Sequence, residues 1–282
     1  MTRKKQLREL TIKDNFMFAA VMMEEENCRK FLEITLGFPI DHVKVSREKS
    51  NVYHPEYKGI RLDVYARDEK RTHYNVEMQV TRKPALGKRV RYYHGQIDME
   101  LLLSGSGYAE LPDAYVIFIC DFDPFGKRKY RYTFERRCLE DAELGLDEGS
   151  RSIFLSTCGE NESEVPKELV KFLRFVKADL SGSEKDFEDD YVKELQETVR
   201  RIKGSREMEE RFMILEEMLK EERAEGLTEG KSRSIIELLQ YCEPVPEALQ
   251  DRILGEKDPE ILKKWLKLAA SVNSLEEFQK NI

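Results

Sequence analysis

The stretch DAYVIFICDF at residues 113–122 constrains the fold more than any other part of the chain. Its interior is a nearly continuous run of apolar residues, and its charged residues lie at or near the two ends. An apolar run of this length is typical of a strand that is buried on both faces of a sheet. Both faces of such a sheet must be covered by helices, so we expect an α/β layer structure.

The segments on either side of this strand predict the order helix, three strands, helix, strand. The first helical segment ends at Gly37 and is expected to form two short helices, or one helix broken near Glu26. The second is expected to open at Pro84 and close at Gly105. Two of the strands are joined by the polar stretch RDEKR and should form a hairpin. The predicted elements are helical at 12–36, extended at 43–55, 59–66 and 72–80, helical at 84–105, and extended at 113–122, 129–136 and 152–157.

From residue 165 onward the chain has a helical pattern. Gly226 and Gly230 are expected to interrupt an otherwise good helix. The segment 206–224 is a candidate for pairing with another helix, and a solvated helix packed on its own domain explains it equally well. We therefore expect an α/β domain at 1–160 and a helical region at 161–282 with a role in oligomerisation or regulation.

The composition argues against several classes of protein. Charged residues make up 37% of the chain and apolar residues 40%, which is too apolar for wholesale disorder. No apolar run approaches the roughly 20 residues that span a bilayer. The basic start MTRKKQLREL is not followed by an apolar segment, so we expect a cytoplasmic location and no membrane partner. The five cysteines are widely spaced without a C-x-x-C pair, so neither a disulfide framework nor a zinc site is expected.

The run NVEMQV at residues 75–80 alternates apolar and polar residues, as a strand with two different faces does. Glu77 and Gln79 share its polar face. If the hairpin turn is centred near Lys70, opposed positions sum to one constant, which pairs 61 with 79, 63 with 77 and 65 with 75. Asp63 then lies opposite Glu77, and like charges so placed destabilise the sheet unless something positive compensates them.

Three compensators are available for Asp63 and Glu77: Arg61 opposite Gln79, a basic residue from the next helix, and a bound divalent cation. Two carboxylates with a backbone carbonyl between them form a hard oxygen site of the kind that binds Mg²⁺. Such an ion polarises a phosphoryl oxygen and lowers the pKa of bound water. The alternative is an exposed strand face that Arg61 neutralises, and spacing alone favours this alternative.

The predicted helix after this strand favours a functional site over an exposed strand face. Arg89, Tyr93 and Gln96 recur at i, i+4 and i+7 and form one polar and aromatic stripe. Arg89 can therefore face the carboxylates, and Lys88, Arg91 and Tyr93 can contact DNA. The net charge of −7 nevertheless disfavours nonspecific coating of nucleic acid by the whole surface. The structural alternatives are an ion pair for Arg89, a core position for Tyr93, and plain surface charges for Lys88 and Arg91.

Several motifs stand in a characteristic order along the chain. They are K-D-N-F-M-F at 13–18, L-D-V-Y-A around Asp63, N-V-E-M-Q ending at Gln79, K-R-V-R-Y-Y-H-G-Q with L-L-L-S-G-S-G-Y downstream, V-I-F-I-C-D-F-D-P-F, and E-R-A-E-G-L-T-E-G-K in the C-terminal part. This set closely resembles the Rpn family, the recombination-promoting nucleases and transposases of the PD-(D/E)XK superfamily. The resemblance implies a restriction-endonuclease-like core, α-β-β-β-α-β, with a mixed sheet flanked by helices and a C-terminal helical extension.

The resemblance also implies roles for individual residues. Asp63 and Glu77 would hold one or two Mg²⁺ ions, for which Mn²⁺ can substitute, and the backbone carbonyl of Met78 would be a further ligand. Asp14, in the opening motif, would support the site, and Gln96 is a second supporting candidate.

The superfamily's lysine falls at Gln79, which leaves two accounts open. In the first, the amide of Gln79 orients the attacking water, Arg89 supplies the missing positive charge and the enzyme is active. In the second, the site binds metal or DNA but cleaves poorly. We favour the first account, because both metal carboxylates are intact and glutamine is common in this family.

We therefore expect a Mg²⁺-dependent DNA endonuclease linked to recombination or transposition, with DNA as its partner and no small-molecule cofactor. A homodimer is a further partner to test, since two strand cuts usually call for two active sites. The first alternative is a catalytically weak DNA-binding protein that acts as a transposition accessory or in phage defence. The second is a structural protein whose acidic pair is only a solvated face.

Overall fold

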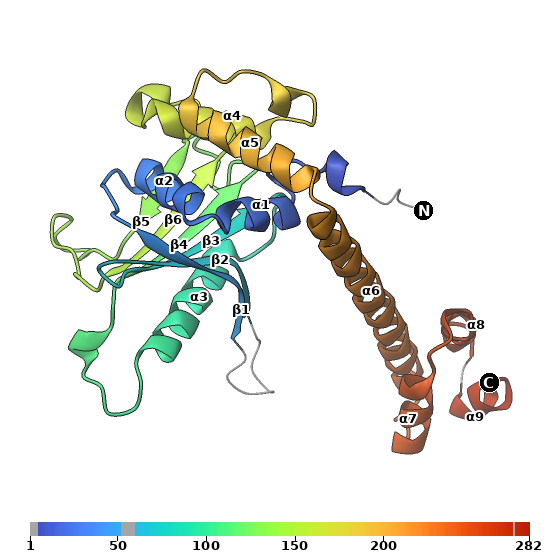
Figure 1. Cartoon of the computed structure of the whole chain (residues 1–282). Helices are drawn as coiled ribbons and strands as arrows, with labels where there is room; N and C mark the ends of the chain where they lie inside the picture. Colours follow the sequence, from blue (N-terminus) through green and yellow to red (C-terminus); the bar gives the residue numbers. More distant parts are fainter. Residues whose placement is uncertain (1–4, 52–59, 273) are drawn as a thin grey trace. The chain divides into compact units, whose positions relative to one another are not determined.

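The computed structural model describes residues 5–51, 60–272 and 274–282, with side chains at 5–46, 63–221, 224–272 and 274–282 (Figure 1). Contacts divide the chain into two compact units, Met1–Met208 and Glu209–Ile282. The first unit contains the sheet and the second is helical. The side chain of Arg61, one of the compensators proposed above, lies outside the described residues.

The described residues of the first unit form a six-stranded mixed sheet with the order β1-β2-β3-β4-β6-β5. β1, β2 and β3 are antiparallel neighbours, β3, β4 and β6 are parallel, and β5 is antiparallel to β6. The strands are β1 Val43–Asn51, β2 Ile60–Asp68, β3 His73–Gln79, β4 Ala114–Cys120, β5 Arg131–Phe134 and β6 Ser150–Ser156. All seven residues of β4 are buried, as its apolar sequence predicts.

Helices cover both faces of this sheet, and Figure 1 shows α3 on one side and α1, α2, α4 and α5 on the other. The α3 side is an apolar cluster that includes Val90 and Ile97 from the helix and Val116 and Phe118 from β4. The bounds are α1 Asn15–Met22, α2 Glu25–Leu36, α3 Leu86–Leu101, α4 Lys167–Lys177 and α5 Asp190–Lys203. Short 3-10 helices lie at η1 Leu7–Glu9, η2 Tyr108–Glu110, η3 Glu162–Glu164 and η4 Gly182–Glu184. The expected α-β-β-β-α-β core is therefore present.

Local sequence signals predict the end of α2 correctly and misplace both ends of α3. Gly37 ends α2 with a φ of 84°, a left-handed conformation that glycine adopts without strain, as the sequence predicts. The helix predicted to open at Pro84 instead begins at Leu86, after Ala85 in a left-handed conformation with φ 58°, and it ends at Leu101 rather than Gly105.

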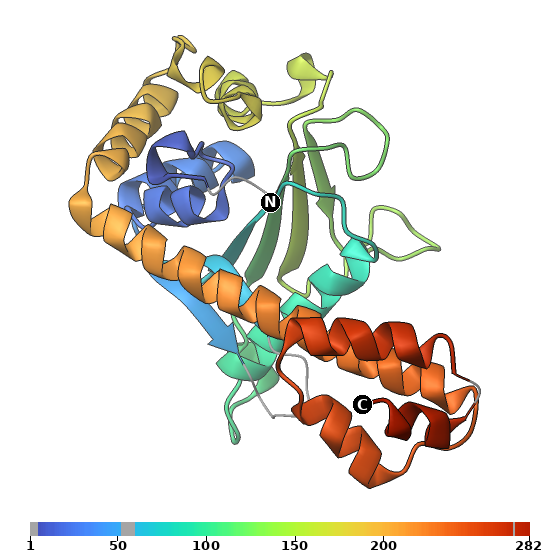
Figure 2. The ribbon, with the colours of Figure 1, turned by 90° about the vertical axis from the view of Figure 1, so that its right-hand side faces the viewer.

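The boundary between the two compact units lies further along the chain than the boundary at residue 160 that the sequence suggested. α4 and α5 lie beside α1 and α2 in both Figure 1 and Figure 2, and Tyr191 Oη donates a 2.7 Å hydrogen bond to the carbonyl of Asn27. Thr198 and Asn27 are also in hydrogen-bond contact. The expected boundary at residue 160 thus lies inside the first compact unit, whereas a functional division into 1–160 and 161–282 stays a prediction.

The expected interruption at Gly226 and Gly230 is wrong, because α6 runs without a break from Arg206 to Gln240. Each interior glycine costs about 1 kcal/mol relative to alanine, and the many good helix formers on both sides outweigh that cost. The break lies instead at Gly204 and Ser205, between α5 and α6.

The second unit has its own apolar core. Figure 2 shows α7 Glu247–Gly255, α8 Pro259–Ala269 and α9 Leu275–Lys280 gathered around the C-terminal end of α6. Their buried side chains include Leu239, Ile253, Leu262 and Phe278. None of the helices in the described part of the chain combines the length and apolar character needed to cross a membrane.

Candidate active site

The β2–β3 hairpin brings Asp63 and Glu77 together. Its ladder pairs Tyr65 with Asn75, as the turn predicts, and is described as far as Val64 opposite Val76. Beyond that point the two carboxylates bond the backbone of the opposite strand. Glu77 Oε1 accepts from the N–H of Asp63 at 3.3 Å, and Asp63 Oδ2 accepts from the N–H of Met78 at 3.2 Å. Side-chain oxygens therefore stand where ladder carbonyls would otherwise accept.

Arg89 of α3 is the cation that faces this pair. Its Nη2 lies 2.9 Å from Glu77 Oε2 and its Nη1 donates to Gln79 Oε1 at 2.7 Å. Nε and Nη2 also donate to the hydroxyl of Tyr93, at 2.8 and 2.6 Å. The guanidinium plane stands over the rings of Tyr93 and Phe118, with 5.0 and 5.2 Å to the centroids. Arg89 is thus held in place by contacts from α3, β3 and β4.

The electrostatics of the pair favour a further positive charge. Burial, reinforced by the charge of Asp63, raises the pKa of the Glu77 carboxyl well above its usual range, and Arg89 only partly opposes this. The side chain of Glu77 is 3% exposed, whereas that of Arg89 is 29% exposed. A buried carboxylate next to a second carboxylate is a site that a small cation stabilises.

Sequence reasoning missed Asn75 and the burial of its neighbours. His73, Asn75, Glu77 and Gln79 form a polar column along one face of β3, and each is less than 8% exposed. Asn75 Nδ2 donates to Glu77 Oε1 at 3.3 Å, while the buried Asn75 Oδ1 has no hydrogen-bond partner among the described residues. Below them the hydroxyl of Tyr65 and His73 Nδ1 are 2.6 Å apart. The alternation in HYNVEMQ, inside a sheet predicted to be covered on both faces, was the signal for this column.

The oxygen donors at this point fit a hard divalent cation. Asp63 and Glu77 supply carboxylates, and the unpartnered Asn75 Oδ1 is a further buried oxygen. The N–H of Met78 faces Asp63, so its carbonyl, on the same side of the strand, faces Asp63 as well. Within the part of the chain that the structure describes, no three His, Cys, Asp or Glu side chains come together. These oxygen donors therefore suit Mg²⁺, which retains several water ligands when bound, better than they suit a metal whose ligands are all side chains.

Gln79 is oriented by its neighbours. Its Oε1 accepts from Arg89, and its Nε2 donates to the carbonyl of Thr81 at 2.8 Å. The amide therefore presents its oxygen to the guanidinium, which stands beside the position where the superfamily carries lysine.

The remaining candidates lie at different distances from the pair. Tyr93 is buried and bonds Arg89, and Gln96 is buried on the same helix. Lys88 and Arg91 are exposed on α3. Asp14 is not brought into the cluster by the contacts that the structure describes, because its carboxylate accepts from the N–H of Thr11 and from Lys5. These contacts fix the turn before α1, and the side chain of Asp14 does not cap the helix.

Comparison with known protein families identifies the fold. A profile of the PD-(D/E)XK nuclease family transposases matches residues 13–229, which includes the hairpin, α3 and the whole sheet. The chain belongs to this family. A search of curated proteins and a search of solved structures gave no match. Membership of the PD-(D/E)XK nuclease family transposases supports a nuclease or transposition-related role, and it confirms the resemblance and fold class inferred from the motifs.

Proposed function

We propose that the protein is a Mg²⁺-dependent endonuclease that hydrolyses phosphodiester bonds in DNA during recombination or transposition. The observation that carries this proposal is the pair of carboxylates, Asp63 and Glu77, bonded to each other's strands and faced by Arg89. Family membership supports a nuclease or transposition-related role, and we take the pair as the place where the reaction would occur.

Asp63, Glu77 and the carbonyl of Met78 would hold the ion, and Mn²⁺ would serve as a substitute. When bound, the ion supplies Lewis-acid polarisation of a phosphoryl oxygen and a lowered pKa for water. Asn75 holds Glu77 Oε1 by its amide, which keeps the carboxylate in one orientation.

Arg89 would stabilise the negative charge that grows on the phosphoryl oxygens during attack. Its guanidinium is held by the Tyr93 hydroxyl and by the faces of two rings, so it needs little reorganisation when a phosphate arrives. Its contact with Gln79 supports the first account of that residue, in which the charge lost with the superfamily's lysine comes from the helix. Gln79 would orient the attacking water, and Lys88 and Arg91 would contact the DNA backbone.

The test is a plasmid-nicking assay in Mg²⁺ with full-length protein. Asp63→Asn and Glu77→Gln are each expected to lower the rate by at least about a hundredfold, because a carboxylate ligand is lost with little change in volume. Glu164→Gln is a matched control, since Glu164 is a carboxylate in η3 that bonds Lys129, away from the hairpin contacts. In titration calorimetry with Mn²⁺, only the wild type and Glu164→Gln should show heat of metal binding. Equal nicking by all four proteins would point to contamination and would refute the assignment.

A second candidate function is a DNA-binding accessory protein that cleaves poorly. The observation in its favour is that Gln79 carries no charge and that Arg89 is already committed to Glu77. This function predicts salt-sensitive DNA binding that survives loss of both carboxylates, with no Mn²⁺ binding and no nicking. Sedimentation at several concentrations, with and without DNA, would test the proposed homodimer in either case.

A further inference from the structure

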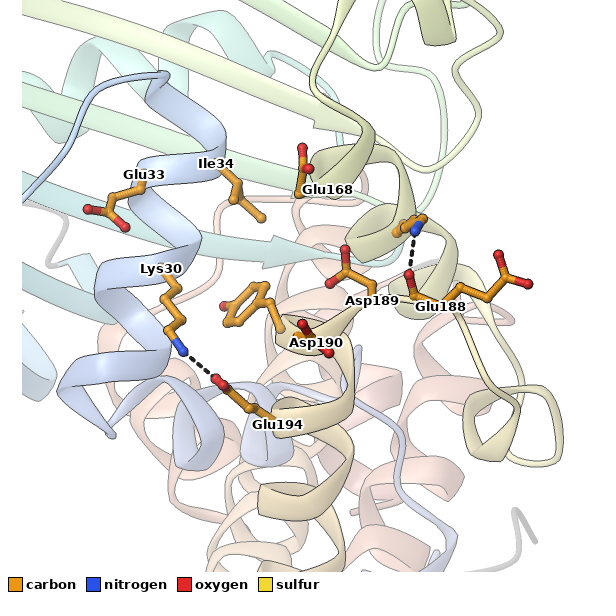
Figure 3. A pocket seen from close by; sticks show the side chains of 10 residues that line it. Lys30, Glu33, Ile34, Glu168, Glu188, Asp189, Asp190 and Glu194 are labelled. Atoms are coloured by element: carbon orange, nitrogen blue, oxygen red, sulfur yellow. Dashed lines mark hydrogen bonds and ion pairs between the residues drawn. The ribbon is translucent and has the colours of Figure 1, made fainter.

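Two pockets in the first unit differ in the ligands that they can accept. The larger, of about 470 Å³, lies between α2, α4 and α5 and is lined mostly by carboxylates (Figure 3). Its two lysines are already engaged, Lys30 with Glu194 and Lys171 with the carbonyl of Glu188. A phosphate-bearing ligand would be repelled there. The smaller pocket, of about 240 Å³, lies between α3 and the β5–β6 edge of the sheet, and we refer to it as the His94 pocket.

The His94 pocket lies on the flank of α3 that faces away from the carboxylates. Gly87, Arg91 and His94 line it and recur at i, i+4 and i+7. At about 100° per residue, this stripe is roughly half a turn around the helix from Arg89 and Tyr93. The opposite wall comes from the sheet, with Phe134 of β5 paired to Ser152 of β6. One helix therefore separates the two sites.

The interior of the pocket carries neutral polar groups. His94 is 8% exposed, and its Nε2 lies 3.1 Å from the hydroxyl of Ser152. Its Nδ1 is buried and has no hydrogen-bond partner within the described chain. Burial lowers the pKa of His94 to about 4, so the ring is neutral at pH 7. A neutral ring nitrogen beside a hydroxyl suits the polar edge of a planar ligand better than it suits a phosphate.

One wall and the rim add an aromatic surface and positive charge. Phe134 packs against Phe125 and Phe154, with centroids at 5.0 and 5.6 Å, yet it remains 47% exposed. Phe125 and Phe154 therefore fix the ring of Phe134, and the rest of its surface is open to a ligand. Arg91 and Arg136 line the pocket together with Glu135 and Glu148, and both carboxylates are paired with arginines, Glu148 with Arg136 at 2.6 Å and Glu135 with Arg137. Arg91 forms no ion pair with the described residues, so its charge is available to an anion.

A basic segment connects the carboxylates to this pocket. Arg82, Lys83, Lys88 and Arg91 are all exposed between the end of β3 and the pocket-facing flank of α3. The chain as a whole has a charge of −7, so this is a local exception. A helix is about 10 Å wide, and a nucleic-acid strand that crosses it advances by about three nucleotides at 3.4 Å each.

We propose that the His94 pocket receives one unpaired base of the nucleic-acid strand whose phosphodiester lies at Asp63 and Glu77. The base stacks on Phe134, its edge bonds the Ser152 hydroxyl that His94 Nε2 orients, and Arg91 contacts the adjoining phosphate. Aromatic stacking combined with a basic track is how proteins hold single strands, and a pocket below the size of drug sites suits a single base. This inference rests on the proposed nuclease function.

The test uses a pair of glycines on α3. A Cβ at Gly87 or at Gly95 meets nothing within 4 Å, so both positions accept a side chain without a clash. Gly87 lines the pocket and Gly95 does not. Gly87→Leu fills the pocket, Gly95→Leu is the matched control, and both replace a glycine of α3 by a better helix former. Neither variant should melt below the wild type, which separates lost binding from lost folding.

Binding is measured by fluorescence anisotropy in EDTA with a labelled 12-nucleotide single strand, and with a series of the same strand that carries one abasic position. We expect Gly87→Leu to bind about tenfold more weakly than the wild type and Gly95→Leu to bind equally well. We also expect one abasic position to weaken wild-type binding to a similar degree and to leave Gly87→Leu unaffected. Phe134→Ala should behave as Gly87→Leu does.

Two other results would be decisive in the opposite direction. Equal affinities for Gly87→Leu and Gly95→Leu, with no sensitivity to any abasic position, would overturn the base pocket and leave the nuclease proposal standing. Absence of DNA binding by the wild type, together with absence of nicking in Mg²⁺, would overturn both. A fully paired DNA duplex serves as a second probe. If Gly87→Leu binds this duplex more weakly than the wild type does, a base is drawn out of the DNA duplex into the pocket.

Discussion

Replacement of Arg89 by methionine is expected to destabilise the protein by about 3 kcal/mol at pH 7.5. Arg89 is the cation bonded to Glu77, whose side chain is 3% exposed, and it also donates to Gln79 and Tyr93. Methionine keeps much of the side-chain volume over the rings of Tyr93 and Phe118 but none of the five N–H donors.

The magnitude follows from these contacts. The neutral partners, Gln79 and Tyr93, account for about 1 kcal/mol, the net contribution of a typical hydrogen bond between a protein donor and a neutral acceptor. Leaving a buried carboxylate without its cation costs about 3–5 kcal/mol if the carboxylate stays ionised. The pKa of Glu77 is already raised by burial and by Asp63, so the carboxyl can take up a proton, and this keeps its part of the cost nearer 2 kcal/mol.

The assay is urea unfolding in EDTA for the wild type, Arg89→Met, Glu77→Gln and the double variant. Glu77→Gln should recover about 2 kcal/mol in the Arg89→Met background, because an amide does not need a cation. Lys88→Met, an exposed position on the same helix, should stay within about 0.5 kcal/mol of the wild type. If the double variant is no more stable than Arg89→Met, the unpaired carboxylate is not the source of the loss and the reasoning is refuted.

Three further outcomes test other parts of the molecule. Burial lowers the pKa of His94 to about 4 in the folded protein against about 6.5 when unfolded, so the unfolded chain binds more protons between these values and stability is lost as the pH falls. Relative to His94→Gln, the wild type should lose about 1.5 kcal/mol between pH 6.5 and pH 5 in urea titrations, and a constant difference would contradict this. A Cβ at Gly159 would lie 2.5 Å from the backbone nitrogen of Tyr130, so Gly159→Ala should lower stability by about 1–3 kcal/mol in thermal melts, whereas Gly145→Ala should not. Residues 1–208 contain the whole sheet and should unfold cooperatively without the second unit; a broad, non-cooperative melt would show that they do not fold alone.

The sequence allowed the sheet and the hairpin to be predicted because their signals are local. The apolar run of β4 and the turn at RDEKR depend only on neighbouring residues, and the turn alone was enough to pair Tyr65 with Asn75. The continuation of α6 through Gly226 was missed because a small local penalty was treated as decisive against a long helical context.

The site could be predicted only in part, because it depends on which face of the sheet the helix covers. The alternation of polar residues on β3 indicated a distinct face, but a wet face and a buried polar face have the same sequence pattern. Asn75 is buried, and His94 Nδ1 has no partner among the described residues, because of how α3 packs on the sheet. α3 lies far from β6 in sequence, yet His94 contacts Ser152 of β6. No spacing rule could place His94 beside Ser152.

The packing of α5 against the N-terminal helices has a consequence for synthesis of the protein. Lys30 of α2 is joined to Glu194, and Asn27 to Thr198, across separations of 164 and 171 residues. At about 5–20 residues per second, roughly 10–30 s pass between the emergence of the two partners from the ribosome. During that interval α2 lacks the helix that covers it, although both carboxylates have already been translated. We therefore expect that nascent chains ending before α5 contain all six strands, but that α1 and α2 complete their packing on the sheet only after α5 has left the ribosome.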